Sequence, residues 1–350
     1  MEWEPNASLQ SWTSFRLPAK AAYRLRCTQP EELLRLPELF PLEELPVLPL
    51  GNGSNVVFAD DYPGIVLRAE FRGIRCIEAE EDTVCIEAAA GEPWHEFVVT
   101  CLRNQWYGLE NLALIPGTVG AAPVHNIGAY GVEVQQFLEG LQVWDRTQNA
   151  FYWLPASAAG LSYRSSLLRT QFLGQLVITH VRFRLLRRAC PRWDYPELHG
   201  FLRAAHVFHP SALDVFHAVV TLRRRKLPDP HQLPNAGSFF KNPIVPQEYA
   251  EELRRRYPQV PCFPQGEGMV KIPAGWLLEQ CGWKGIRQGS VGTWQHHALV
   301  LVAYGPTTGR ELLRFAAQLW RSVYERFGIA LEPEVLILPP EAWQPEELLR

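Results

Sequence analysis

A twenty-residue segment near the middle of the chain, 114–133, contains four glycines and two prolines, which excludes a continuous helix or strand there. It overlaps a longer stretch, 108–131, that is rich in Gly, Pro and Ala. A long loop inside a compact domain is usually functional. The small residues at 120–122 would let a flat ring or a pyrophosphate lie against the backbone. The alternative is an ordinary Ω-loop.

Strands and helices are interspersed on both sides of this segment, which predicts an α+β fold. Thr28 is the candidate cap of the first helix, Pro93 suits the first turn of the second, and Leu213 is expected to face inward from the third. The expected strands are 47–50, 55–59, 65–68, 83–90, 177–186, 298–303 and 334–338, and the expected helices are 30–39, 93–104, 209–226, 246–256, 273–281 and 307–327.

The chain has 350 residues, which is more than one core usually holds, so we expect two or three domains. The sequence Leu-Pro-Asp-Pro at 227–230 would break the preceding helix. It predicts a boundary there, and the division that we expect is 1–70, 71–226 and 227–350.

Composition excludes several classes of function. The net charge of −3 supplies no basic field for nucleic acid, and the basic runs at 223–226 and 254–256 are best interpreted as solvated helix faces. No stretch is apolar enough to span a bilayer, and no signal peptide is visible. The seven cysteines show no metal-binding spacing, which indicates reduced thiols in a cytosolic protein without a metal.

A second glycine-containing turn, Gly51-Asn52-Gly53-Ser54-Asn55, follows the expected strand at 47–50. Its glycines allow close approach of a ligand, and exposed N–H groups in such a turn can bind phosphate. It matches neither a Walker loop nor GxGxxG. A plain strand–turn–strand hairpin explains the pattern equally well.

Three further segments contain candidate catalytic side chains. Ser238 lies in NAGSFFKNP (235–243), where Lys241 is close in sequence, Glu334 precedes the apolar run at 335–338, and Arg164 lies in SYRSS (162–166). A serine can act as an acid only where its anion is stabilised, and an arginine can clamp a carboxylate. Taken singly, a turn serine, a solvent-facing glutamate and a surface arginine are the simpler interpretations.

Together these motifs resemble the UDP-N-acetylenolpyruvoylglucosamine reductase family, type I branch, from about residue 10 to about residue 340. All of them occur in the family's order and spacing, so the resemblance is specific. The motifs that carry it are GNGSN (51–55), LENLALIPGTVGAAPVHNIGAYGVE (109–133), SYRSS (162–166), WDYPEL (193–198), KLPDP (226–230), NAGSFFKNP (235–243) and LEPEV (331–335).

The resemblance implies a non-covalent FAD, NADPH as electron donor, and reduction of the enolpyruvyl ether of a UDP-sugar in peptidoglycan precursor synthesis. No side chain carries hydride, so a flavin is required. Hydride addition to C3 would leave charge at C2 and on its carboxylate, which Arg164 would stabilise together with Glu334. Ser238 would deliver the proton to C2.

The same resemblance assigns binding roles. Residues 1–70 and 71–226 would be two FAD-binding subdomains, and 227–350 a substrate-binding domain. Tyr195 would close over the substrate as a lid, and Lys226 and Asn242 would bind the diphosphate. The FAD-binding residues would be Gly51, Asn52, Gly53, Ser54, Asn55, Pro116, Gly117, Gly120, Ala121, Asn126, Gly128, Ala129, Tyr130, Gly131 and Arg223.

Five positions depart from the family pattern. Asn52 stands where an acidic residue is common, and His125 where glutamine is common. Ala121 and Ala122 stand where some members have serines that contact FAD. His297 replaces a polar residue that contacts substrate, and a histidine at a strand start without a special role is the simpler interpretation.

Two alternatives remain open at this point. One is an oxidase of the same flavin fold with covalent FAD, which the Gly-Ser and Glu-Pro-Glu motifs disfavour. The other is a catalytically inactive nucleotide-sugar binder, which the intact Arg164, Ser238 and Glu334 disfavour. We expect a cytoplasmic monomer that acts on small molecules, without nucleic-acid or membrane partners.

Overall fold

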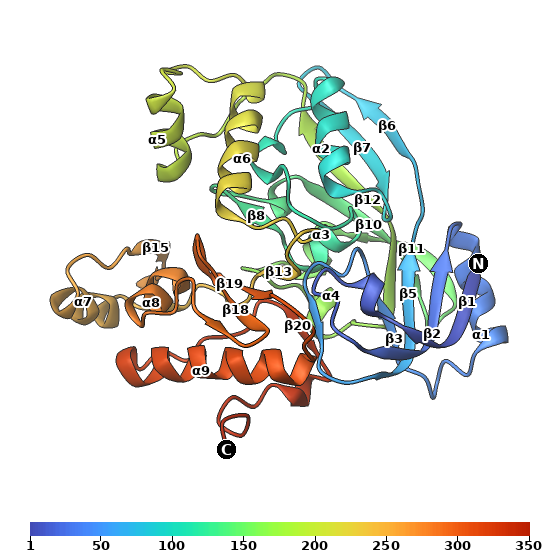
Figure 1. Cartoon of the computed structure of the whole chain (residues 1–350). Coiled ribbons are helices and arrows are strands. Elements are labelled where there is room, and N and C mark those ends of the chain that lie inside the picture. The colour runs from blue at the N-terminus through green and yellow to red at the C-terminus, as the bar shows by residue number, and fades with distance from the viewer. The chain divides into compact units, whose positions relative to one another are not determined.

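The computed structural model describes all 350 residues, and the chain forms two compact units, which are drawn in Figure 1. Each unit contains helices and strands, which confirms the predicted α+β class. No helix is both long enough and apolar enough to cross a membrane. The first unit contains Met1–Ala7, Ala21–Asn52 and Pro63–Arg224, and the second contains Ser8–Lys20, Gly53–Tyr62 and Arg225–Arg350.

The first unit begins with a four-stranded sheet in the order β1-β2-β5-β3, in which β3 and β5 are parallel. A 3₁₀ helix and a short α-helix follow β2 and bury Leu33 and Leu36. The elements are β1 (Glu2–Ser8), β2 (Lys20–Cys27), η2 (Pro30–Arg35), α1 (Leu36–Leu39), β3 (Val47–Pro49) and β5 (Tyr62–Ala69).

The larger sheet of the first unit is antiparallel, in the order β11-β10-β12-β7-β6. Helix α2 packs on it because its apolar stripe places Trp94 and Phe97 against Phe183 of β12. The elements are β6 (Ile74–Ala79), β7 (Thr83–Ala89), α2 (Trp94–Arg103), β10 (Leu138–Asp145), β11 (Ala150–Pro155), β12 (Leu176–Leu186), α5 (Pro196–Ala204) and α6 (Ala212–Lys226).

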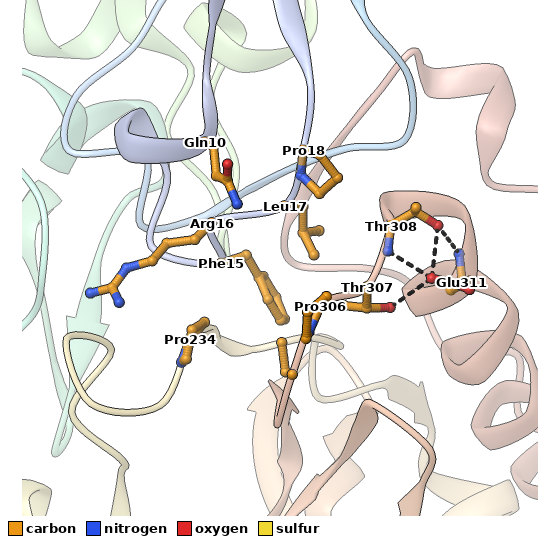
Figure 2. Close-up of a pocket in the computed structure, with 12 residues that line it drawn as sticks. Gln10, Phe15, Arg16, Leu17, Pro18, Pro234, Pro306, Thr307, Thr308 and Glu311 are labelled. Atoms are coloured by element: carbon orange, nitrogen blue, oxygen red, sulfur yellow. Dashed lines mark hydrogen bonds between the residues drawn. The ribbon is translucent and has the colours of Figure 1, made fainter.

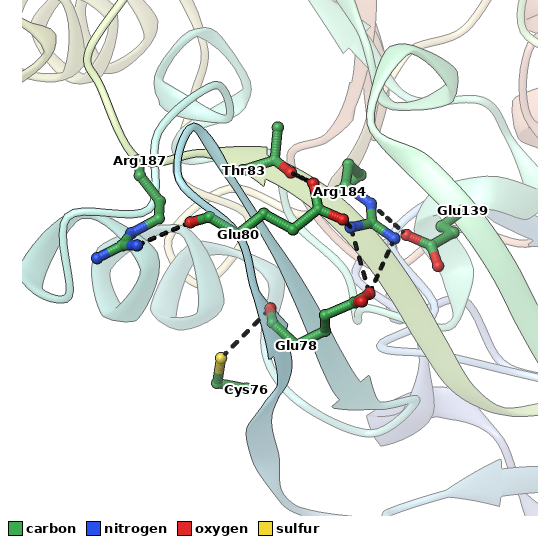
Figure 3. Close-up of polar contacts among 7 residues, drawn as sticks. All are labelled: Cys76, Glu78, Glu80, Thr83, Glu139, Arg184 and Arg187. Atoms are coloured by element: carbon green, nitrogen blue, oxygen red, sulfur yellow. Dashed lines mark hydrogen bonds and ion pairs between the residues drawn. The ribbon is translucent and has the colours of Figure 1, made fainter.

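The exposed edge of this sheet carries a network of charges, shown in Figure 3. Arg184 of β12 donates to Glu139 at 2.8 Å, to Glu78 at 3.4 Å and to Glu80 at 3.5 Å. Arg187 donates to the backbone oxygen of Glu80 at 2.7 Å. Because these groups are solvated, each pair contributes little to stability, about 0–1 kcal/mol. The charges on the edge strand β6 also discourage pairing with another chain.

The second unit has a sheet in the order β13-β19-β18-β17, a three-stranded sheet β14-β16-β15, and a parallel pair of β4 and β20. The buried face of α9 is part of its core. Thr308 and Glu311 form a capping box at the N-terminus of this helix. The elements are β4 (Val56–Phe58), β13 (Asn235–Ser238), β14 (Ile244–Pro246), α7 (Gln247–Arg256), β15 (Phe263–Gly266), β16 (Met269–Lys271), α8 (Ala274–Gln280), β17 (Arg287–Gln288), β18 (Val291–Trp294), β19 (His297–Ala303), α9 (Gly309–Phe327) and β20 (Leu336–Leu338).

The glycine-rich segment of the first unit contains only short elements, as its composition predicts. These are η3 (Glu110–Leu112), α3 (Ala121–Val124), β8 (Gly128–Ala129) and β9 (Val132–Glu133). The hairpin interpretation of 51–55 is wrong, because β3 pairs with β5 whereas β4 pairs with β20.

Three local predictions are also wrong. Gln29, not Thr28, caps the first helix, because Glu32 completes a capping box with it. Pro93 is the N-cap of α2 and lies just outside its first turn. Leu213 is 54% exposed, and Val215 occupies the buried face of α6 instead.

Candidate active site

In the first unit the two glycine-containing turns lie against each other. The amide of Asn52 donates to the backbone oxygen of Gly117 at 3.2 Å. A Cβ on Gly51 would lie 2.9 Å from the hydroxyl of Thr118, so only glycine allows this close approach. Gly117 has a φ of 131°, a backbone conformation that side chains rarely adopt.

The N–H groups of these turns are available to a ligand. Those of Gly51, Asn52, Gly117 and Thr118 donate to no acceptor within the protein. Neighbouring backbone donors of this kind bind phosphate oxygens. The donors present therefore fit the pyrophosphate of a dinucleotide such as FAD.

The segment is fastened to the start of α2. The indole of Trp94 donates to the oxygen of Leu112 at 2.8 Å, and the N–H of Trp94 donates to the oxygen of Gly117 at 3.1 Å. The N–H of Gly120 donates to Ala90 at 2.9 Å. A side chain at position 120 would clash with Ala90, because a Cβ on Gly120 would lie 2.6 Å from the Cβ of Ala90.

Arg164 is held against the other end of the same segment. Its backbone is left-handed, with φ of 54°, and its guanidinium donates to the oxygens of Asn126 at 3.3 Å and Gly128 at 2.6 Å. The fully buried Asn126 donates to the oxygen of Ser162 at 2.9 Å and to Glu133 at 3.1 Å. The loop that contains Arg164 and the glycine-rich segment are thus one hydrogen-bonded structure.

Tyr130, Tyr195 and Arg223 also belong to this unit. The rings of Tyr130 and Tyr195 meet edge to face with centroids 5.6 Å apart. Burial raises the pKa of Tyr130 to about 12, so its hydroxyl stays protonated. Burial lowers the pKa of Arg223, whose Nε donates to the oxygen of Leu114 at 3.3 Å. Tyr195 is 38% exposed at the start of α5.

In the second unit the residues Gly53–Asn55 are held by the protein itself. A Cβ on Gly53 would lie 2.1 Å from the oxygen of Trp12, so backbone packing alone requires glycine there. The oxygen of Asn55 accepts from the N–H of Leu336 at 3.0 Å, and its amide donates to the oxygen of Glu334 at 3.4 Å. Asn55 therefore supports the segment that contains Glu334.

Ser238 and Glu334 come from segments that lie side by side. Ser238 pairs with Val300 at the end of β13. The next residue, Phe239, accepts a hydrogen bond from the N–H of Glu334 at 2.8 Å. Lys241 does not direct its charge to Ser238, because its amine forms an ion pair with Glu332. Two of the three predicted catalytic residues therefore lie on adjoining segments of one unit.

The predicted diphosphate-binding residues are also in the second unit. The side-chain oxygen of Asn242 accepts from the N–H of Ala274 at 2.9 Å, which caps the start of α8. Lys226 is the last residue of α6. His297 lies nearby: burial, with the charges of Lys226 and Lys284, lowers its pKa to about 4. His297 is the first residue of β19, as expected, and its ring is held neutral there.

A pocket of about 580 Å³ elsewhere in the second unit contains none of the predicted site residues (Figure 2). Apolar side chains of Phe15 and Leu17 and three prolines form much of its wall. The hydroxyl of Thr307 donates to Glu311 at 3.0 Å at its rim, where it closes the first turn of α9. These polar groups serve the helix cap.

Sequence reasoning missed Asn111 and His95, and it noted His125 only as a departure from the family pattern; all three shape the first unit's site. Asn111 donates to the oxygens of Tyr130 at 3.0 Å and Arg192 at 2.9 Å. His125 lies beside Arg169, and burial lowers its pKa to about 3. His95 accepts from the N–H of Leu114 at 3.0 Å. Each acts through contacts distant in sequence, so no local pattern could have identified it.

Comparison with known proteins agrees with this geometry. A family model described as FAD binding domain matches residues 21–149, and one described as UDP-N-acetylenolpyruvoylglucosamine reductase, C-terminal domain, matches 229–338. A crystal structure of UDP-N-acetylenolpyruvylglucosamine reductase from Thermus caldophilus shares the fold, with a TM-score of 0.64 and 24% identity over 97% of this chain and 98% of that one. The chain therefore belongs to the class of proteins that combine an FAD binding domain with a reductase C-terminal domain.

Curated relatives give the family. UDP-N-acetylenolpyruvoylglucosamine reductase of Chromobacterium violaceum is 46% identical over 97% of this chain and 99% of its own. The protein of the same name from Xylella fastidiosa is 44% identical over 95% of each chain. The chain belongs to the UDP-N-acetylenolpyruvoylglucosamine reductase family, which confirms the resemblance predicted from its motifs.

Proposed function

We propose that this protein reduces the enolpyruvyl ether of UDP-N-acetylglucosamine to UDP-N-acetylmuramate, with NADPH as electron donor and FAD as cofactor. The observation that carries the proposal is the near full-length likeness to reductases of that name, combined with the pairing of the Ser238 and Glu334 segments. FAD, when bound, supplies the two-electron chemistry that no side chain offers. The four unpaired N–H groups of Gly51, Asn52, Gly117 and Thr118 would hold its pyrophosphate.

Arg164 stabilises the negative charge that develops on the substrate carboxylate. A guanidinium binds a carboxylate with two parallel hydrogen bonds and stays charged at any working pH. The bonds from Arg164 to the oxygens of Asn126 and Gly128 fix its plane before substrate arrives. A donor that is already oriented needs no rearrangement during the reaction.

Ser238 donates the proton to C2, and Glu334 works on the same part of the substrate. The hydroxyl is at the end of a strand whose following residues are hydrogen-bonded to the Glu334 segment. This support keeps both side chains on rigid backbone, as acid catalysis requires.

Substrate binding is divided among three residues in this proposal. Tyr195 closes over the UDP-sugar, and Lys226 and Asn242 bind its diphosphate. The expected roles of 1–70 and 71–226 as FAD-binding subdomains and of 227–350 as the substrate-binding domain belong to the same proposal. The remaining predicted FAD contacts are also part of it. We further propose that the protein works as a monomer in the cytoplasm on small-molecule substrates alone.

An anaerobic spectroscopic titration tests this function. The purified protein should be yellow, with a flavin spectrum that NADPH bleaches and that the enolpyruvyl UDP-sugar then restores. Heat or acid should release all flavin from the precipitated chain. Bleaching without recovery on addition of the UDP-sugar would contradict the proposed substrate. Flavin that stays on the precipitate would contradict the non-covalent assignment.

A further inference from the structure

Leu114 opens the glycine-rich segment in an unfavourable backbone conformation. Its φ is 58°, in the left-handed region, where the Cβ of a residue other than glycine crowds the following carbonyl oxygen. Such a residue persists only where its surroundings hold it. Two side chains do so: the N–H of Leu114 donates to Nδ1 of His95 at 3.0 Å, and its oxygen accepts from Nε of Arg223 at 3.3 Å.

The bond to His95 is the middle one of three between the start of α2 and this segment. Trp94 supplies the other two, to the oxygens of Leu112 and Gly117. The two Trp94 bonds use donors that cannot titrate. His95 is the one member of the set whose hydrogen-bonding role depends on its protonation state.

The ring of His95 is fixed by helix α6. It stacks on Phe216 with an interplanar angle of 3° and centroids 5.8 Å apart. Arg223 follows Phe216 by seven residues, about two helical turns, so it lies on the same face of α6. One helix therefore orients both side chains that hold Leu114.

We propose that His95 is a positioning residue for FAD: its neutral ring, protonated on Nε2, accepts the Leu114 N–H and keeps the following turn in the conformation that presents the N–H groups of Gly117 and Thr118. This inference rests on the proposed binding of FAD. His95 contacts the loop and not the reacting atoms, so its effect is on cofactor affinity.

Protonation reverses this role. A proton on Nδ1 places a donor against the Leu114 donor and breaks the bond. Burial lowers the pKa of His95 below its ordinary value of 6.5, Glu96 of α2 raises it and Arg224 of α6 lowers it. The neutral ring thus dominates at pH 6.5 and above, and the bond is lost only as the pH falls through the lowered pKa of His95. FAD binding needs the intact loop, so at such a pH it must be accompanied by release of the proton from Nδ1 of His95.

Two substitutions at His95 test the hydrogen-bond acceptor and the stacking ring separately. His95→Asn keeps an acceptor near the position of Nδ1 and cannot be protonated in this range. His95→Phe keeps the stacking ring and removes the acceptor. His180 supplies the matched control as His180→Asn, because it is also a partly buried histidine of this unit with a lowered pKa, but it bonds to Gln142.

The experiment measures the Kd of FAD by flavin fluorescence at pH 8.0 and 5.5, with the full-length chain stripped of cofactor. Wild type and His180→Asn should bind more weakly at pH 5.5, by up to about 5- to 10-fold, which is the worth of one hydrogen bond once His95 is fully protonated. His95→Asn should bind equally at both pH values. His95→Phe should bind about 5- to 10-fold more weakly at pH 8.0. Hydrogen exchange of the Leu114 amide should accelerate in His95→Phe.

Several outcomes would overturn the inference. It fails if His95→Asn retains the pH dependence of wild type, or if His95→Phe binds FAD as wild type does at pH 8.0. Thermal melting shows whether each variant is folded. If His95→Phe does not fold, the pH dependence of FAD binding in His95→Asn still tests the inference. Wild-type protein that binds no FAD at either pH would contradict the proposed function instead.

Discussion

The two units hold their candidate site residues by different means. In the first unit, Leu114, Asn126, Tyr130 and Arg164 all have left-handed backbones without being glycine, and side chain to backbone bonds hold the segment. In the second unit, Ser238 and Glu334 do not have left-handed backbones, and backbone bonds hold their segments together with one side-chain bond, from the Asn55 amide to Glu334. A site of the first kind depends on many supporting side chains, whereas one of the second kind depends chiefly on the reacting groups themselves.

The largest effect that this comparison predicts is at Ser238. Ser238→Ala removes the proposed proton donor but leaves the strand pairing in place, so folding should change little. Reoxidation of the flavin by the UDP-sugar should slow about 10²-fold or more, the usual worth of a positioned acid. Reduction by NADPH should be nearly unchanged. Stopped-flow measurement of each half-reaction checks this, with Ser238→Cys as a control that keeps a donor.

Equal slowing of both half-reactions would show that Ser238 has a structural role. No slowing of either would remove the serine from the mechanism and leave Glu334 or water as the proton source. Either outcome would also contradict the contrast between the two units, because the site residues of the second unit would then not act mainly as reacting groups.

The supporting structure of the first unit is tested at Gly128. A Cβ there would lie 2.7 Å from Nη1 of Arg164, 2.9 Å from Cγ of Glu133 and 3.0 Å from the oxygen of Val132, so Gly128→Ala should displace the guanidinium and strain the β8–β9 turn. Its φ is not in the left-handed region, so the backbone itself accepts alanine. We expect turnover to fall about 10-fold or more, since small misplacements in a site are costly. The UDP-sugar half-reaction should account for the loss.

Gly200 provides the control for this substitution. It lies within α5, and a Cβ there would meet nothing within 4 Å. Gly200→Ala should leave activity unchanged and raise stability by about 0.5–1 kcal/mol, because alanine favours the helix. If Gly128→Ala behaves as Gly200→Ala does, the bonds to Arg164 do not orient it for catalysis.

His297 predicts a pH effect in the second unit. The unfolded histidine titrates near 6.5, but burial beside Lys226 and Lys284 holds the folded pKa at about 4. Below pH 6.5 the unfolded chain takes up a proton that folded His297 refuses, so this stability is complete above 6.5 and lost as the pH falls toward 4. His297→Gln should reduce the loss by about 1–2 kcal/mol after allowance for solvent screening.

Denaturant titrations of wild type and His297→Gln at pH 7.5 and 4.5 measure this difference. His125 of the first unit, whose pKa is lowered to about 3, still contributes acid sensitivity in both proteins. Identical pH dependence in the two proteins would show that the pKa of folded His297 is close to that of the unfolded chain, which contradicts the prediction.

The sequence predicted most elements of the fold but not its long-range pairings. Local periodicity predicted the strand at 177–186 and the helix at 307–327, which the structure has at Leu176–Leu186 and Gly309–Phe327. It could not show that residues 53–62 join the second unit, because parallel pairing of β4 with β20 depends on contacts far apart in sequence.

The candidate site shows the same limit. Motifs identified Ser238, Glu334 and Arg164, because reacting residues lie in distinctive local sequence. The side chains that orient the first unit's loop, such as His95 and Asn111, have no such signal, since their partners are backbone atoms up to 81 residues away.

The smallest predicted effect separates two roles of Asn242. Its side-chain oxygen caps α8 by accepting from Ala274, so Asn242→Ala should cost about 1 kcal/mol of stability and lower the Tm by a few degrees. Asn242→Asp keeps the acceptor at the positive end of the helix dipole and should restore the Tm. If Asn242 also binds the diphosphate, the added negative charge should weaken UDP-sugar binding several-fold. Calorimetric melting and UDP-sugar titration of both variants test this. Normal UDP-sugar affinity in Asn242→Asp would restrict Asn242 to the helix cap and leave Lys226 as the proposed diphosphate contact.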